Sequence, residues 1–334
     1  MMERVRAAFA PPSPADHELL NQALSRDARL TFNFMVLTLA SCAIATFGLL
    51  ENNVAVIIGA MIVAPLILPL GPVAYGALEG DARLLRRGVI TVVAGTVLAV
   101  GLAALLTLAF GFQTFGSEIL SRSQPNLLDL GVAIAAGLVA AFARVQPKVA
   151  GTVAGTAIAV ALMPPLCVVG IALAGGAHDL ARGATLLYIT NLLGIIIASM
   201  AVYAISRHAR IHRAGVALFW TTLAMAVILI PLGASTGNLL RQSRVEATLR
   251  NALLNGTVTF QRVDLLRTDF NWLASPPEVH LLVRSRNALT PNQVQQLQAF
   301  ATRKTGLKFK FFFDVSPITE VTDTGSATAP EPTP

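Results

Sequence analysis

Charged residues are scarce in this sequence of 334 residues. Asp, Glu, Lys and Arg together make up 13% of it, whereas soluble domains carry about 25%. The long stretches that contain none of these four residue types include 30–50, 52–78, 88–117, 149–178 and 183–206. Each is longer than the roughly 20 apolar residues that cross the hydrocarbon core of a bilayer. One soluble core could explain one such stretch but not five, so the sequence predicts an integral membrane protein.

Cysteine is also rare, and the sequence has no recognisable catalytic constellation. Cys42 and Cys167 lie within apolar stretches without a metal-binding spacing, so we expect them to be packing residues. No buried acid pair and no Ser/His/Asp set is evident, and we therefore expect no enzyme activity, no cofactor and no metal. His208 and His212 have a metal-compatible spacing, but their arginine-rich surroundings favour an anchor at the membrane surface.

The apolar stretches predict an all-α polytopic bundle of about seven transmembrane helices. A backbone in lipid must satisfy its own hydrogen bonds, which favours helices over isolated strands. The expected spans are 30–50, 53–78, 88–112, 127–143, 149–174, 183–206 and 215–233. Residues 1–29 precede them, and 17–29 is expected to form a short amphipathic helix at the membrane surface.

Basic residues are distributed unevenly between the two sides of these spans. With the N-terminus in the cytoplasm, the outer loops hold only Arg122 and Arg182. The inner segments hold Arg4, Arg6, Arg26, Arg29, Arg83, Arg86, Arg87, Arg144, Lys148, Arg207, Arg210 and Arg213. Positive residues favour the cytoplasmic side, so we expect a multi-pass protein of the cell (inner) membrane with a cytoplasmic N-terminus. The same distribution accounts for the net charge of +7 without nucleic acid as a partner.

The C-terminal part of the chain has no long apolar stretch. Residues 241–320 predict a small soluble α+β domain, which seven crossings would place outside the cytoplasm. Its expected helices are 244–254 and 290–303, and its expected strands are 257–266, 279–284 and 308–315. Residues 321–334 are rich in Ser, Thr, Pro and Gly and are expected to be a disordered tail.

Two segments that lie 95 residues apart resemble one another. Residues 69–88 read PLGPVAYGALEGDARLLRRG and residues 164–183 read PPLCVVGIALAGGAHDLARG, with nine of twenty positions identical. The shared Pro and Arg-Gly are hard to explain by chance. We therefore predict a 3+3 repeat over 30–112 and 127–206, followed by an extra helix at 215–233. Three crossings per copy give the two copies opposite orientations in the membrane, which is an inverted repeat.

Each copy centres on a helix that proline interrupts. The second helix carries Pro65, Pro69 and Gly71, and the fifth carries Pro164 and Pro165. Proline removes a backbone donor and clashes with the preceding turn, so both helices should be kinked or broken. Matching interruptions in two inverted halves indicate a substrate site near the membrane midplane. Kinks that only serve helix packing are the alternative.

A few polar side chains within the spans complete the expected site. Asn191 lies in the sixth helix, and the 95-residue spacing maps it onto Thr96 of the third. Both are candidates for ligand contact, with a hydrogen bond between helices as the alternative. Asp129 is a candidate for coupling to a proton or cation. Its place near a helix start, like that of Glu51, equally fits a favourable interaction with the helix dipole.

Three segments resemble the signatures of a known family. They are SCAIATFGLLENNVAVIIGAMIVAPLILPLGPVAYGALEGD (41–81), GTAIAVALMPPLCVVGIALAGG (155–176) and LLYITNLLGIIIA (186–198). They resemble the domain-of-unknown-function family 389, a group of uncharacterised hydrophobic membrane proteins, and the resemblance covers about residues 30–206. Many relatives carry a soluble region before the membrane part, whereas this chain has a C-terminal one. The resemblance implies a membrane fold and no particular activity.

Together these features predict a transporter or channel-like protein for a small ion or polar solute. The lipid bilayer is the expected partner, and a homo-oligomer is compatible with the sequence. A non-transporting sensor or scaffold is the alternative, in which the extracytoplasmic C-terminal domain binds a partner. A polar cavity beside the proline-bearing helices would favour transport, and a solid membrane core with a concave or apolar face on residues 241–320 would favour the sensor.

Overall fold

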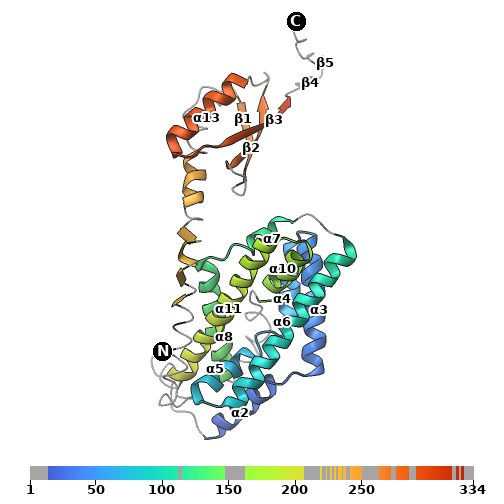
Figure 1. Cartoon of the computed structure of the whole chain (residues 1–334), viewed down its shortest axis with the longest axis vertical. Helices are drawn as coiled ribbons and strands as arrows, with labels where there is room; N and C mark the ends of the chain where they lie inside the picture. The colour runs from blue at the N-terminus through green and yellow to red at the C-terminus, as the bar shows by residue number, and fades with distance from the viewer. Residues whose placement is uncertain are drawn as a thin grey trace. The chain divides into compact units, whose positions relative to one another are not determined.

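The computed structural model describes residues 14–111, 115–146, 162–206, part of 219–249, 263–271, 276–285, 291–317, 321–322 and 325–326. The chain divides into two compact units, Met1–Thr236 and Gly237–Pro334. The first unit is helical, and the second combines helices with a small sheet. The two units are described separately below, as the first unit and the second unit (Figure 1).

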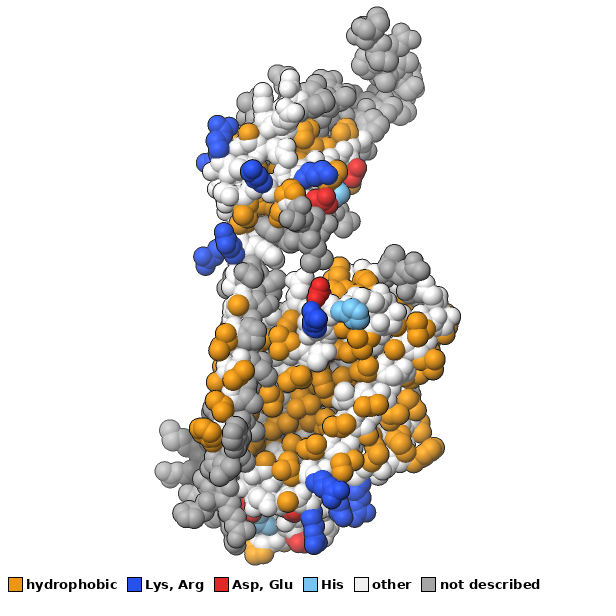
Figure 2. Space-filling view, in the orientation of Figure 1, with side chains coloured by type: hydrophobic (Ala, Val, Ile, Leu, Met, Phe, Trp, Pro, Cys, Tyr) orange, Lys and Arg blue, Asp and Glu red, His pale blue; other side chains and the backbone are white. Residues whose placement is uncertain are grey.

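Four described helices of the first unit are long and apolar enough to cross a membrane. They are α3 (Phe32–Leu50), α6 (Ala82–Phe110), α8 (Leu127–Val145) and α11 (His178–Ile205). The outward face of α6 is apolar, with Val97 65% exposed and Leu108 67% exposed. A soluble protein rarely leaves so extended an apolar surface in water. Figure 2 shows hydrophobic side chains across the middle of this unit and Lys and Arg side chains gathered at one end.

The second helix is broken, as its prolines predict. It consists of α4 (Val54–Val63) and α5 (Leu70–Glu79), with residues 64–69 outside any helix. The side chain of Asn53 caps α4 by accepting hydrogen bonds from the N–H groups of Ala55 and Val56. Of the predicted fifth span, 149–174, the structure describes α10 (Met163–Ala174), and the region 147–161 before it lies outside the described residues.

Two shorter helices flank the long ones. The first is α2 (Pro14–Asp27), which begins three residues before the predicted surface helix at 17–29. It buries Leu20 and Leu24 in the main core of the first unit. The second, α7 (Ser117–Ser121), was not predicted because it is only one turn long. It precedes α8 and adds no crossing.

The long helices α6 and α11 begin earlier than the apolar stretches that predicted them. We expected starts at 88 and 183, and the observed starts are Ala82 and His178. In α6 the start is fixed by Asp81, whose side chain accepts hydrogen bonds from the N–H groups of Arg83 and Leu84. Absence of charge marks the part of a helix that lipid can cover, whereas a capping residue marks where the helix begins.

Small residues let the long helices approach closely. A Cβ on Gly170 of α10 would lie 2.5 Å from the carbonyl oxygen of Val100 in α6. A Cβ on Gly137 of α8 would lie 2.6 Å from the carbonyl oxygen of Ile195 in α11. Cys42 and Cys167 are fully buried free thiols with sulfur atoms 3.6 Å apart, in a packing position between α3 and α10. Close packing of small residues is the usual source of helix association in lipid.

The second unit contains a three-stranded sheet with the order β1-β2-β3. β1 (Val263–Asn271) pairs antiparallel with β2 (Glu278–Ser285), which pairs parallel with β3 (Lys310–Pro317). The parallel pair needs a crossover connection, which α13 (Pro291–Thr305) supplies. Its core includes Val279 and Leu281 of β2 and Leu297 and Ala301 of α13, together with Leu249 from the helical residues 241–249.

Three predictions on the C-terminal part need separate comment. β1 continues to Asn271, beyond the expected end at 266, because its pairing with β2 extends that far, and the expected residues 257–262 lie outside the described ones. The tail predicted as disordered contains a two-residue ladder between β4 (Val321–Thr322) and β5 (Gly325–Ser326), a pairing that a tight turn can support locally. The predicted helix 215–233 lies largely outside the described residues, although its described positions are helical.

Candidate functional site

The first interruption is a compact turn between α4 and α5. Pro65 and Pro69 are both buried in it. Two backbone hydrogen bonds hold the turn, from Leu68 N–H to the Pro65 carbonyl at 3.0 Å and from Leu70 N–H to the Ile67 carbonyl at 3.2 Å. Since proline cannot donate a backbone hydrogen bond, the regular helical ladder stops here and carbonyl groups become available to other partners.

The second pair of prolines lies at the start of α10. Pro164 and Pro165 occupy its first turn, where the missing backbone donors would have no helical partner in any case. Both prolines are buried, as are the neighbouring Leu162 and Met163. No side-chain cap closes this described helix start. A helix thus begins at this proline pair, as α5 begins after Pro69.

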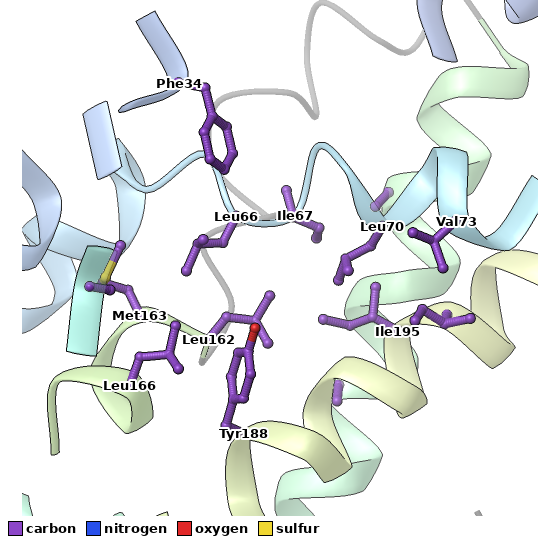
Figure 3. Packing of buried hydrophobic residues seen from close by; sticks show 14 of the residues in the cluster. Phe34, Leu66, Ile67, Leu70, Val73, Leu162, Met163, Leu166, Tyr188 and Ile195 are labelled. Atoms are coloured by element: carbon purple, nitrogen blue, oxygen red, sulfur yellow. The ribbon is translucent and has the colours of Figure 1, made fainter. Parts of the chain in front are cut away.

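The two interruptions lie close together in the core. Leu66 and Ile67 from the first and Leu162 and Met163 from the second belong to one cluster of buried hydrophobic residues. Figure 3 shows these side chains around Tyr188 of α11, whose hydroxyl points toward the Leu66–Ile67 turn and Leu162. The residues around Pro69 and those around Pro164, which are 95 residues apart in the sequence, are thus close together in the structure. Apolar side chains fill the space between them.

Tyr188 supplies a polar group within this apolar cluster. Its hydroxyl oxygen lies 2.7 Å from that of Thr96 in α6. The Thr96 hydroxyl donates to the Val92 carbonyl at 2.9 Å, so the Tyr188 hydroxyl is left as the donor to Thr96. Asn191 lies three residues after Tyr188 in α11 and is fully buried. Thr96 thus makes the hydrogen bond between helices considered from the sequence, but to Tyr188, which the sequence analysis missed because tyrosine reads as part of an apolar run.

Arg144 builds a second polar cluster at one end of the broken helix. It comes from the last turn of α8, and its guanidinium donates to Asp27 of α2 from Nε at 3.3 Å and Nη2 at 3.2 Å. Nη2 also donates to the Leu68 carbonyl at 3.2 Å. Both charged side chains are largely buried, with 13% of Arg144 and 20% of Asp27 exposed. Arg144 therefore satisfies a carbonyl that the proline interruption releases.

Gly71 is the residue that allows this cluster to form. A Cβ at this position would lie 3.1 Å from the Arg144 Cζ and 3.1 Å from the Tyr203 hydroxyl oxygen. The rings of Tyr203 and Tyr75 meet edge to face at a centroid distance of 5.5 Å. Gly71 was predicted to contact a ligand, which stays a prediction, and in the structure the guanidinium lies beside the space that a Cβ here would fill. The sequence analysis used Arg144 only to set the orientation, because its partner Asp27 lies 117 residues away.

The Asp27 carboxyl responds to two opposing effects. Burial raises its pKa above the ordinary value, while attraction to the Arg144 guanidinium and the hydrogen bond from it lower the pKa. Burial is the larger effect. Burial of the ionised pair therefore costs desolvation free energy, which the attraction to Arg144 offsets only in part, as expected for charges taken out of water.

Asp129 takes part in a capping arrangement at the start of α8. Its carboxylate accepts a hydrogen bond from the Asn126 N–H at 3.0 Å, and the Asn126 side chain accepts from the N–H groups of Leu128 and Asp129. This reciprocal pattern is a capping box. These hydrogen bonds support a role for Asp129 in stabilising the start of α8. Its coupling to a proton or cation stays a prediction.

Metal chemistry has no support within the described part of the chain. No three His, Cys, Asp or Glu side chains gather there in a way that could hold an ion. His208 and His212 lie outside the described residues. The polar groups that converge on the broken helices are the Thr96 and Tyr188 hydroxyls, the Leu68 carbonyl and the Arg144–Asp27 pair.

Long apolar helices, an apolar outer face and a core built around interrupted half-helices define a helical membrane protein. Residues 61–197 match the model of the family described as Domain of unknown function (DUF389), which confirms the resemblance found in the sequence. The chain is also similar to an uncharacterized protein of Methanocaldococcus jannaschii, with 26% identity over 223 residues. That match covers 64% of this chain and 69% of the relative.

Proposed function

We propose that this membrane protein moves a small ion or a polar solute across the bilayer, and that it is a transporter or channel-like protein rather than an enzyme. One observation carries the proposal: two proline-interrupted helices meet in the core around the Tyr188–Thr96 hydroxyl pair. Irregular backbone at membrane depth is tolerated where it packs against protein or lines a pathway. The apolar packing around Tyr188 corresponds, in this proposal, to an occluded state.

The helix limits support an inverted repeat as the basis of transport. α8 begins and ends 95 residues after α3, and α11 ends 95 residues after α6. In Figure 1, α6 and α11 run in opposite directions through the first unit, and α5 and α10 lie toward opposite ends of it. Two copies of opposite direction allow a central site to open alternately to each side.

The residues near the interruptions favour a solute without a large net charge. The hydroxyls of Thr96 and Tyr188 and the amide of Asn191 are neutral hydrogen-bonding groups. The nearest ion pair, Arg144–Asp27, is internally neutralised and engages the Leu68 carbonyl. A neutral polar solute fits these groups, and a small ion would rely on carbonyl oxygens released by the prolines.

The arrangement in the membrane belongs to the same proposal. We place the N-terminus and the arginines at the start of α6 in the cytoplasm of a multi-pass inner-membrane protein with seven spans. This arrangement puts the second unit outside the cytoplasm. The clustering of Lys and Arg at one end of the first unit supports it, because positive residues are retained on the cytoplasmic side (Figure 2).

A sensor or scaffold is the second candidate, and one observation favours it. Leu66, Ile67, Leu162 and Met163 are all buried, so the contact between the interruptions is apolar and tightly filled. A membrane domain that only anchors the second unit would need such a core and no pathway. The two candidates differ in whether water ever reaches these residues.

Cysteine accessibility tests the proposal in the full-length protein. Cys42 and Cys167 are replaced by alanine, and single cysteines are introduced at Leu66, Ile67 or Leu162. Membrane-impermeant thiol reagents are then applied from each side in turn. Val97→Cys on the exposed apolar face of α6 is the unreactive control, and Asp179→Cys, whose side chain is 94% exposed, is the reactive one.

Labelling of the core positions would support a water-filled pathway, and complete protection from both sides would leave the sensor as the better explanation. Transport by a labelled protein then permits a second test. Tyr188→Phe keeps the ring and removes the hydroxyl, so flux should fall while folding is retained. Unchanged flux in Pro69→Ala and Pro164→Ala would contradict a role for the interruptions.

A further inference from the structure

The second unit contains a cavity of about 410 Å³ between the helical residues 241–249 and the end of α13. Its charged lining consists of Arg241 and Arg244 from the first element and Lys304 from the second. Gly237, Val245, Thr248 and Thr305 complete the lining. The cavity is therefore a concave surface with three cations from two separate helices, and the described residues that line it include no acidic one.

No described acidic side chain pairs with the three cations of the cavity. Across the described part of the chain, none of them forms an ion pair, whereas Arg144, Arg122 and Arg182 each do. Figure 2 shows Lys and Arg side chains at several places on the second unit, one of them beside Asp and Glu side chains. Their combined positive field falls on the cavity, where an anion would experience it most strongly.

We propose that this cavity binds a phosphate group. Arginine offers paired N–H donors that match phosphate oxygens, and lysine adds a point charge. Thr248 and Thr305 place hydroxyl oxygens in the same lining. The Thr305 hydroxyl donates its hydrogen to the Ala301 carbonyl and accepts from Leu307 N–H, so in this proposal the hydroxyl donor to phosphate is Thr248 and not Thr305. The phosphate can come from the headgroup of an anionic phospholipid or from a soluble phosphate, since the recognising chemistry is the same.

Helix stabilisation alone does not account for all three charges. Lys304 lies in the last turn of α13, where a cation interacts favourably with the helix dipole. Arg303 shares that turn and is not part of the lining. Arg241 and Arg244 come from a different helical segment and converge on the same cavity. A purely structural role predicts that cations at the end of α13 affect stability, whereas a phosphate site predicts selective loss of binding.

The test uses the full-length protein in two arms. In the first, the protein is purified in a neutral detergent and titrated with inorganic phosphate, and binding is followed by calorimetry. In the second, it is placed in nanodiscs of phosphatidylcholine with or without phosphatidylglycerol, and bound lipid is identified by native mass spectrometry. The test variant is Arg241→Gln/Arg244→Gln/Lys304→Gln. The matched control, Arg284→Gln/Arg303→Gln/Lys308→Gln, removes the same charge from exposed positions outside the lining.

The expected result is binding in one arm that weakens about tenfold or more in the test variant and by less than about twofold in the control. Phosphate binding identifies a soluble ligand, and selective phosphatidylglycerol retention identifies a lipid headgroup. Equal losses in both triple variants would reduce the effect to general charge and overturn the proposal. Absence of binding in both arms by the unaltered protein would overturn it as well. Transport is not part of either readout, so the proposal stands or falls separately from the function of the first unit.

Discussion

Arg144 joins three segments of the first unit that are far apart in the sequence. Its guanidinium contacts Asp27 at the end of α2 and the Leu68 carbonyl in the interruption, and it packs over Gly71 at the start of α5. Buried ion pairs of this kind contribute little net stability, but removing one partner leaves an uncompensated charge. The role of Arg144 is therefore to fix geometry at the interruption.

Arg144→Gln should destabilise the protein more than Asp27→Asn does. The first change leaves a buried carboxylate without its counter-charge, at a cost of about 2 kcal/mol, below the usual range for a buried pair because part of both side chains is exposed. The second leaves the Arg144 charge unpaired, but its guanidinium keeps the amide oxygen and the Leu68 and Ala140 carbonyls as acceptors. Thermal unfolding in detergent measures both, and Arg86→Gln, at an exposed position, serves as the control. Equal melting temperatures for the two variants would contradict this account of the pair.

Asp27 should also make stability depend on pH. Because burial raises its pKa in the folded protein, the folded state binds the proton more tightly than the unfolded state does. The stabilising contribution of the protonated form is present below the ordinary aspartate pKa of about 3.9 and is lost as pH rises through the raised value. Unfolding temperatures measured across this interval should decline in the unaltered protein. The difference between it and Asp27→Asn isolates the contribution of this carboxyl.

Sequence reasoning located the interruption but not the residues that complete it. Pro65, Pro69 and Gly71 could be found because proline and glycine act on their own backbone, whatever surrounds them. Arg144 and Tyr188 act through partners supplied by other helices, and nothing in their local sequence identifies those partners. From the sequence alone, the charge of Arg144 indicated only the orientation in the membrane, and Tyr188 was taken as part of an apolar stretch.

The helices of the first unit illustrate which limits sequence can define. α3 and α8 match the predicted spans 30–50 and 127–143 to within two residues at each end, because apolar content begins and ends with the helix. α6 and α11 extend beyond their apolar parts into charged turns. Arginine is a good helix former, so a transmembrane helix continues past the lipid until a cap or glycine ends it.

Gly137→Ala should disturb the contact between α8 and α11, whereas Gly131→Ala in the same helix should not. A Cβ at 137 would meet the Ile195 carbonyl oxygen at 2.6 Å and the Ile195 Cα at 2.7 Å, and a Cβ at 131 would meet nothing within 4 Å. We expect a loss of about 1–3 kcal/mol for the first and a gain of up to about 1 kcal/mol for the second.

Thermal unfolding of both glycine variants in one detergent provides the measurement. Because the two positions share a helix, differences in helix propensity cancel from the comparison. A loss in Gly131→Ala as large as that in Gly137→Ala would mean that α8 does not approach α11 as described.

At the scale of the whole molecule, the chain combines two units of different chemistry. The first presents apolar side chains outward over its middle, and the second buries a compact core between a sheet and α13. The contrast could be read from the sequence, because scarcity of charge ends near residue 234. The sheet order and the parallel pairing of β2 with β3 could not, since they depend on contacts between distant segments.

The proposed topology predicts opposite accessibility for two exposed arginines. In a background without native cysteines, Arg303→Cys in the second unit should react with an impermeant thiol reagent in intact cells. Arg86→Cys at the start of α6 should react only after the membrane is permeabilised. Mass spectrometry of the purified protein records both. Reaction of both positions from the same side would require an even number of crossings between them and would rule out the seven-span arrangement.

The helices of the first unit differ greatly in length, and the bilayer must accommodate the difference. At 1.5 Å per residue, the 29 residues of α6 extend about 43 Å, whereas the 19 residues of α3 and of α8 extend about 28 Å. A hydrocarbon core of about 30 Å matches the short helices and leaves α6 to tilt or to project beyond it. Lipids with longer acyl chains would stretch past the ends of α3 and α8. The length of the lipid acyl chains should therefore affect this fold, because it sets the mismatch between the bilayer thickness and the lengths of α3, α6 and α8.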